Sequence, residues 1–276
     1  MHDSTKEAVR SVVSNHQGLW PKSALIIGHP GHELRVLGWV RAAKPLVAIL
    51  TDGSGADGAP RIDQTTQLLD NVVHRSDSYG LASDRELYRA ILGQDIDYFL
   101  ALSSRLADEL CEHRIECVAG DSIEGYNPTH DLCCLLIDRA VRLASGRMDV
   151  TVRHYAFPLL GSPRPDGLSA DSQCLRLTPD ELALKLASIR QYAHSAGGVL
   201  VTEIDDLLDR FGDQAFAEEV FDRVDIAAAL SAFDDAKPFY ETYGEQQVTA
   251  GKYRFVIRYR EHIAPIARAL AKKSSR

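Results

Sequence analysis

Residues 23–33, Ser-Ala-Leu-Ile-Ile-Gly-His-Pro-Gly-His-Glu, decide the fold. The apolar run that ends at Gly28 does not alternate with polar residues, which is typical of a strand buried on both faces of a sheet. Apolar residues then recur at helical spacing over 33–43, and residues 45–50 form a second buried run. Two strands joined by a helix predict a βαβ unit with parallel strands and a right-handed crossover.

The same alternation of apolar runs and amphipathic stretches continues along the chain. It predicts strands over 115–120, 149–157 and 252–259, and helices over 64–74, 84–92, 96–113, 130–144, 178–194 and in the region 203–230, with a basic helix at the end. Residues 51–80 are otherwise interpreted as a long polar loop. We therefore expect a Rossmann-like, doubly wound α/β fold with a mostly parallel sheet and helices on both faces. We expect a single domain over 1–276, with a catalytic-type core over about 20–195 and a C-terminal extension over about 196–276.

Composition narrows the class of protein. The chain has 276 residues, of which 45% are hydrophobic and 25% charged, as in ordinary globular proteins. Because 31 Lys and Arg face 39 Asp and Glu, the net charge is −8, and nucleic acid is not an expected partner. No apolar run reaches the roughly 20 residues needed to span a bilayer. The five cysteines include no CxxC pair, so we expect reduced thiols in a cytoplasmic protein.

Polar residues follow three of the expected strands. They are residues 29–33, residues 51–53 and residues 121–131. Because a ligand site in a parallel α/β sheet lies beyond the carboxyl ends of its strands, these junctions are expected to meet. His29, His32 and His130 would then supply three neutral imidazoles, which is a ligand set for zinc with an open position for water. The alternative is that all three are polar residues at helix ends.

Several side chains at these junctions could assist a hydrolytic reaction. Candidates for a general base are Asp52, Asp121, Glu124 and Glu33, and the sequence does not choose among them. Each also has a structural interpretation as a turn, cap or helix-start residue. The Asn127 amide could donate to a developing oxyanion, or it could serve only as a turn residue before a helix. Residues 53–58 match GxGxxG, but Pro60 follows at once, so we expect a polar loop bordering the site and no dinucleotide.

The order of these motifs resembles the PIG-L/LmbE-like zinc N-deacetylases. The resemblance rests on HPGHE after the first strand, TDG after the second, Arg85-Glu86 and Leu92-Gly93 around a helix, and NPTHD at the start of another. It covers roughly residues 23–145 and continues weakly over 185–192. It implies that His29 and His130 fall on two metal ligands of the family and that His32 replaces a third, an aspartate. Gly31 stands where the family has its general-base aspartate, and Asn127 where it has a histidine.

The resemblance implies a metal-dependent hydrolase in which a zinc-activated water attacks an amide carbonyl. The implied substrate is a small molecule, an N-acylated amino sugar or a conjugate of one. Two alternatives stay open: a non-catalytic family member that binds a ligand or partner, and a metalloenzyme repurposed to another C–N or ester bond. The sequence leaves the oligomeric state open.

Overall fold

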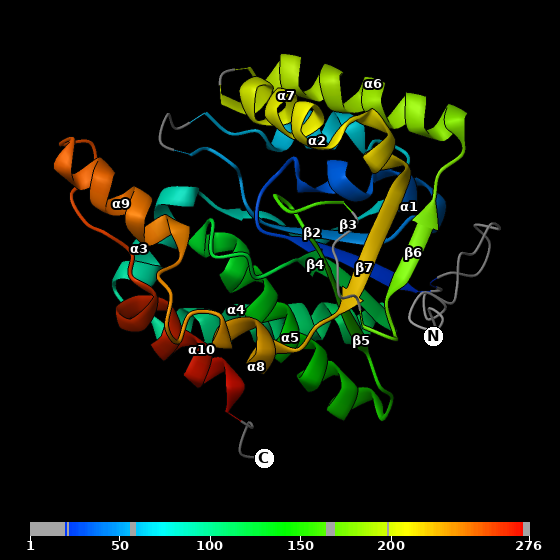
Figure 1. Ribbon diagram of the computed structural model, residues 1–276. Helices are drawn as coiled ribbons and strands as arrows, with labels where there is room; N and C mark the ends of the chain where they lie inside the picture. The colour runs from blue at the N-terminus through cyan, green and yellow to red at the C-terminus, as the bar shows by residue number, and fades with distance from the viewer. Residues whose placement is uncertain (1–19, 21, 56–58, 164–168, 198, 273–276) are drawn as a thin grey trace, which may run out of the picture.

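The strands form one sheet in the computed structural model, which describes residues 20, 22–55, 59–163, 169–197 and 199–272 (Figure 1). The sheet has seven strands in the order β3-β2-β1-β4-β5-β7-β6. They are β1 (Ser23–Ile27), β2 (Leu46–Thr51), β3 (His74–Ala82), β4 (Cys117–Asp121), β5 (Arg153–Phe157), β6 (Gln173–Arg176) and β7 (Glu218–Arg223). The first five in sheet order pair in parallel, whereas β7 runs antiparallel to both β5 and β6. The expected α/β fold with a mostly parallel sheet is confirmed.

Helices cover both faces of this sheet (Figure 1). One face carries α1 (Leu37–Ala43), α2 (Ile62–Leu68), α6 (Pro179–Ala196) and α7 (Val199–Phe211). The other carries α3 (Asp84–Leu92), α4 (Ile96–Glu112), α5 (Pro128–Met148) and α10 (Ala264–Ala271). The remaining helical elements are α8 (Ile226–Ser231), α9 (Phe239–Thr249), the 3-10 helices η1 (His32–Val36) and η2 (Asp213–Ala217), and the π-helical turn η3 (Tyr259–Ile263). No helix in these described ranges is both long and apolar enough to cross a membrane.

The alternation of side chains along β1 explains why both faces are covered. Ala24 and Ile26 belong to the core beneath α4 and α5, while Leu25 and Ile27 belong to the core beneath α1 and α6. All five β1 residues are buried, so the strand has no face that water could solvate. The unbroken apolar run in the sequence is the direct consequence of this position at the centre of the sheet.

Three sequence predictions are wrong. The polar stretch interpreted as a loop contains β3, an edge strand that pairs only with β2 and therefore needs no continuous apolar run. The region predicted to be helical over 203–230 contains β7, which inserts between β5 and β6 of the same sheet. The strand predicted over 252–259 does not form; residues 252–258 have no regular strand pairing, and η3 begins at Tyr259.

A buried ion pair joins β7 to α6, and its carboxylate also caps α1. Lys185 Nζ lies 2.7 Å from Glu219 Oε1, and both side chains are almost completely buried. The Glu219 carboxylate also accepts the backbone N–H groups of Gly38 and Trp39, at 2.8 and 2.6 Å. These are free donors at the start of α1, so a distant strand supplies the cap that the local sequence lacks. Lys185 donates in addition to the Arg35 carbonyl, at 2.7 Å, and so helps to fix the turn that bears His32.

We expect Lys185→Met to destabilise the protein by about 3–5 kcal/mol, because it leaves the buried Glu219 carboxylate without its cation. Urea unfolding measures this loss. Arg190→Met is the matched control: Arg190 pairs with Asp213 at 3.1 Å, but both side chains are about half exposed, so its cost should stay below about 1 kcal/mol. Equal costs for the two variants would contradict the structural role of the buried pair.

Candidate functional site

The carboxyl ends of β1, β2 and β4 meet at one edge of the sheet, because these strands are neighbours and run in parallel. His29 follows β1, Thr51 ends β2 and Asp121 ends β4. His130 lies in the first turn of α5, which packs across the same sheet. The three polar junctions of the sequence are thus brought together, as the parallel topology predicts.

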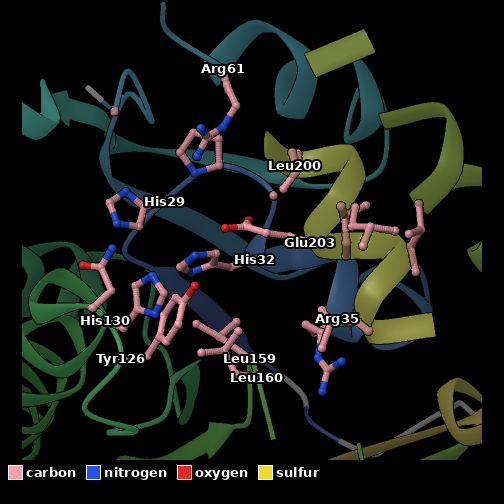
Figure 2. A pocket seen from close by; sticks show the side chains of 18 of the residues that line it. His29, His32, Arg35, Arg61, Tyr126, His130, Leu159, Leu160, Leu200 and Glu203 are labelled. Atoms are coloured by element: carbon pink, nitrogen blue, oxygen red, sulfur yellow. The ribbon is translucent and has the colours of Figure 1, made fainter. Parts of the chain in front are cut away.

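His29, His32 and His130 form a cluster of imidazoles (Figure 2). The ring centroids of His29 and His32 are 5.3 Å apart, those of His29 and His130 5.2 Å, and those of His32 and His130 4.5 Å. His29 and His130 are buried, and His32 is partly buried. Two residues from the turn after β1 and one from α5 therefore share one small volume.

Hydrogen bonds fix the tautomer of His29. Its Nδ1 lies 2.8 Å from Thr51 Oγ1, whose own hydrogen is donated to the Gly28 carbonyl at 3.0 Å. The hydroxyl must therefore accept from His29, which places the imidazole hydrogen on Nδ1. Asp84 Oδ1, 3.0 Å from the same nitrogen, favours that hydrogen too. The lone pair of His29 is consequently on Nε2, an atom that is buried and has no hydrogen-bond partner in the described structure.

Asp121 orients His32. Both oxygens of its fully buried carboxylate lie 3.0 Å from His32 Nδ1, and Oδ2 also accepts the Gly28 N–H at 2.8 Å. Burial raises the pKa of Asp121 to about 7, although the bond from Gly28 opposes the shift. With the carboxylate on Nδ1, the Nε2 of His32 is the nitrogen left for a ligand.

The environment keeps two of the imidazoles neutral. Burial lowers the pKa of His32 and of His130 well below the usual value, and the neighbouring imidazoles lower both further. His130 Nδ1 is buried without a hydrogen-bond partner among the described residues. Neutral rings with unpartnered nitrogens are the form in which histidine binds a metal.

The cluster fits zinc in the chemistry of its donors. Its three imidazoles match a common catalytic ligand set, and two of them have acceptors behind Nδ1, as metal-binding histidines usually do. The atoms do not stand in a finished coordination shell: among the described residues, no group of three or more His, Cys, Asp or Glu side chains is arranged to hold a metal ion. A metal would therefore require the rings to adjust.

Of the other predicted site residues, Asn127 lines the pocket that faces the histidines, whereas the carboxylates of Asp52, Asp121, Glu124 and Glu33 do not line it and accept backbone donors instead. Asp52 accepts the N–H of Ser54, Glu33 that of Gly31, and Glu124 those of Leu159, Leu160 and Gly161. Glu33 is fully buried, which raises its pKa to about 7. Asn127 caps α5, with Oδ1 accepting the Thr129 N–H at 2.9 Å, and its side chain borders the pocket that faces the histidines.

This pocket has a volume of about 290 Å³. Its apolar wall comes from two loop residues, Leu159 and Leu160, and from α7, which contributes Leu200, Ile204 and Leu207. Gly55, from the loop expected to border the site, also lines it; residues 56–58 of that loop lie outside the described residues. Figure 2 shows Tyr126 and His130 on one side and Glu203 of α7 on the other.

Several polar residues of this pocket were not predicted from the sequence; among them are Asp84, Arg61 and Glu203. Asp84 begins α3 just after β3, so the strand-end rule would have found it if that polar edge strand had been recognised. Burial would raise the Asp84 pKa, but the adjacent His29 and the bond from the Gly55 N–H hold it below its usual range. Glu203 lies on a helix far along the chain, where no local signal points to a site.

Gly31 has a conformation that explains its residue type. Its φ of 105° lies in the region that side chains rarely adopt, and a Cβ there would meet the Tyr192 ring at 3.4 Å. Tyr192 is itself held by a 2.9 Å hydrogen bond to Thr65. A longer side chain at position 31 would have to pass beside this fixed ring.

Comparisons with known proteins return deacetylases among solved structures. A deacetylase triple mutant of the teicoplanin biosynthetic pathway is 13% identical and matches 73% of this chain and 97% of its own, with a TM-score of 0.47. The A40926 pseudoaglycone deacetylase is 15% identical over 73% and 96%, with a TM-score of 0.49. A zinc-inhibited form of teicoplanin deacetylase is 12% identical over 74% and 99%, with a TM-score of 0.45.

No family model matches the chain, and no curated protein matches it either. The structural neighbours are named as deacetylases, the class that the sequence motifs resemble. Likeness at these identities and TM-scores says nothing by itself about what this chain does.

We expect Gly31→Ala to cost about 1–3 kcal/mol of stability, because it forces an L-residue into a strained backbone conformation. Gly31→Asp should cost at least as much. The control is Gly146→Ala in α5, where a Cβ meets nothing within 4 Å and alanine should be neutral or slightly stabilising. Thermal unfolding compares them; a fully stable Gly31→Asp variant would show that the turn accepts a carboxylate.

Proposed function

We propose that this chain is a zinc-dependent hydrolase that cleaves the amide bond of a small N-acylated molecule, an amino sugar or a conjugate of one. The observation that supports the proposal is the cluster of His29, His32 and His130, in which the His29 lone pair is buried, unpartnered and directed by Thr51. The residues around the cluster also support the proposal, because the carboxylates of Asp121 and Asp84 lie beside Nδ1 of His32 and His29.

The residues have distinct roles in this proposal. Zinc, when bound by the three imidazoles, supplies Lewis-acid activation of water and of the amide carbonyl. Asp121 holds the His32 ring with Nε2 free, and Thr51 does the same for His29. Asn127 keeps its Oδ1 on the helix cap, which leaves its NH₂ group as the donor for the oxyanion that develops on the carbonyl.

The pocket suits the acyl part of such a substrate. The wall formed by Leu159, Leu160 and Leu200 is apolar and lies beside the imidazoles (Figure 2). Burying an acyl chain against it removes apolar surface from water and also excludes bulk water from the carbonyl. The polar sugar would face the charged group of Arg61.

A second candidate function is a non-catalytic binding protein. It is favoured by Gly31, which offers no side chain where the resembled family has its base, and by the unfinished arrangement of the rings. The two functions differ in whether zinc binds at this cluster and whether amides are then hydrolysed.

We expect untagged protein to bind one equivalent of zinc, and His29→Ala and His130→Ala each to lose it, because two imidazoles do not make a strong site. His113→Ala removes an exposed histidine after α4 and should bind zinc like the unchanged protein. Elemental analysis after dialysis against limiting zinc measures the ratio. Absence of zinc from the unchanged protein, or its retention in both site variants, would contradict the proposal.

We further expect Asp121→Asn to weaken zinc binding by about 10–100-fold, because the amide no longer supplies a carboxylate to the His32 ring. Competition with a chromogenic chelator gives the affinity. Asp52→Asn is the control, since the Asp52 side chain accepts only the Ser54 N–H within the described contacts and should leave zinc affinity unchanged. Equal affinities for all three proteins would remove Asp121 from the metal site.

A further inference from the structure

Two of the described carboxylates line the pocket in front of the imidazoles: Asp84 and Glu203. Asp84 is held against His29: its Oδ1 lies 3.0 Å from His29 Nδ1, and its Oδ2 accepts the Gly55 N–H at 2.6 Å. It stands behind the His29 ring, on the side away from the free Nε2. The carboxylate that remains for a proton transfer inside the pocket is therefore that of Glu203.

Glu203 comes from α7, outside residues 23–145 and 185–192, over which the sequence motifs resemble the deacetylases. Its side chain is exposed to the pocket, and Figure 2 shows the carboxylate directed from the helix toward His29 and His32. Neither a hydrogen bond nor an ion pair engages it within the described residues, unlike Asp52, Glu33, Asp121 and Glu124, which all accept backbone N–H groups. Ile204 and Leu208, its neighbours on α7, are buried and hold the helix in place.

The turn after β1 offers no carboxylate to the pocket, because Glu33 is fully buried, accepts the Gly31 N–H and does not line the pocket. Gly31 has no side chain, its φ of 105° disfavours one, and Tyr192 occupies the space beside it. Glu203 approaches the same imidazoles from the opposite wall. Gly31 thus provides no carboxylate on the turn, and Glu203 of α7 provides one from across the pocket.

We propose that Glu203 is the general base of this site, supplied by the C-terminal part of the chain in place of a carboxylate at position 31. This inference rests on the proposed hydrolase function and deepens it. The Glu203 carboxylate takes a proton from the attacking water as the new C–O bond forms. It returns that proton to the amide nitrogen as the C–N bond breaks. Each amide and water consumed therefore gives one carboxylic acid and one free amine, and the Glu203 carboxylate is regenerated.

The charges around Glu203 suit this role. Desolvation by the pocket wall raises its pKa above the usual value, while the positive charge of Arg61 pulls it back down. The carboxyl is thereby a stronger base than an exposed glutamate, yet it still ionises.

The test compares zinc-loaded unchanged protein, Glu203→Gln and Asp206→Asn. Asp206 is exposed on the same helix, outside the pocket lining, so its variant carries the same change in charge. Amine release from N-acetylglucosamine and N-octanoylglucosamine gives kcat and KM. Glu203→Gln should lower kcat by on the order of 10²–10⁴-fold with little change in KM and full zinc content, whereas Asp206→Asn should match the unchanged protein.

A second readout needs no turnover. Acetohydroxamic acid binds zinc sites as the hydroxamate, and a base in the site can take the proton that it loses and return it as a hydrogen bond to the bound ligand. Glu203→Gln should weaken its binding to the zinc-loaded protein by about tenfold, the loss of one charge-assisted hydrogen bond. Asp206→Asn should not weaken it.

The outcomes separate the two proposals. If the unchanged protein hydrolyses either probe and Glu203→Gln does so equally well, Glu203 is not the base, while the hydrolase function stands. If the zinc-loaded protein hydrolyses neither probe, and hydroxamate affinity is the same in all three proteins, both the hydrolase and the base are overturned. A parallel loss of zinc in Glu203→Gln would make the residue a structural or ligand group and also overturn the inference.

Discussion

The buried carboxylate of Asp121 is the constraint on which the site depends. It ends β4, accepts the N–H of Gly28 at the end of β1, and lies 3.0 Å from His32 Nδ1. A carboxyl group with no exposed surface is costly unless donors surround it, and its raised pKa is the sign of that cost. One side chain therefore links the sheet, the turn after β1 and the imidazole cluster, and the parallel order β2-β1-β4 is what allows it to do so.

Residues of the C-terminal half of the chain fix the turn that bears His32 and complete the pocket. Glu219 of β7 caps α1, and its partner Lys185 of α6 holds the Arg35 carbonyl, so the turn that bears His32 is fixed from a distant part of the sequence. Helix α7 then forms a wall of the pocket and brings Glu203 to face the histidines (Figure 2). The pocket consequently includes groups from both halves of the chain.

Much of the fold could be predicted because burial on both faces produces unbroken apolar runs, as in β1 and β2. The edge strand β3 carries polar residues and pairs on one side only, so its sequence looks like a loop, and with it Asp84 was missed. Strand β7 forms because it pairs with β5 and β6, and its own sequence does not show the residue pattern of a strand. His29, His32 and His130 were found because they follow strands or begin a helix on the sheet, a rule that does not reach Glu203.

The central claim is that three imidazoles from two junctions form one zinc site. X-ray absorption at the zinc edge of the protein loaded with one equivalent of zinc tests it most directly. The account predicts a low-coordinate zinc with three imidazole nitrogens at about 2.0 Å and a light atom in the open position. Zinc bound through sulfur at about 2.3 Å, or with no more than one imidazole, would contradict the claim, because the metal would then lie away from His29, His32 and His130.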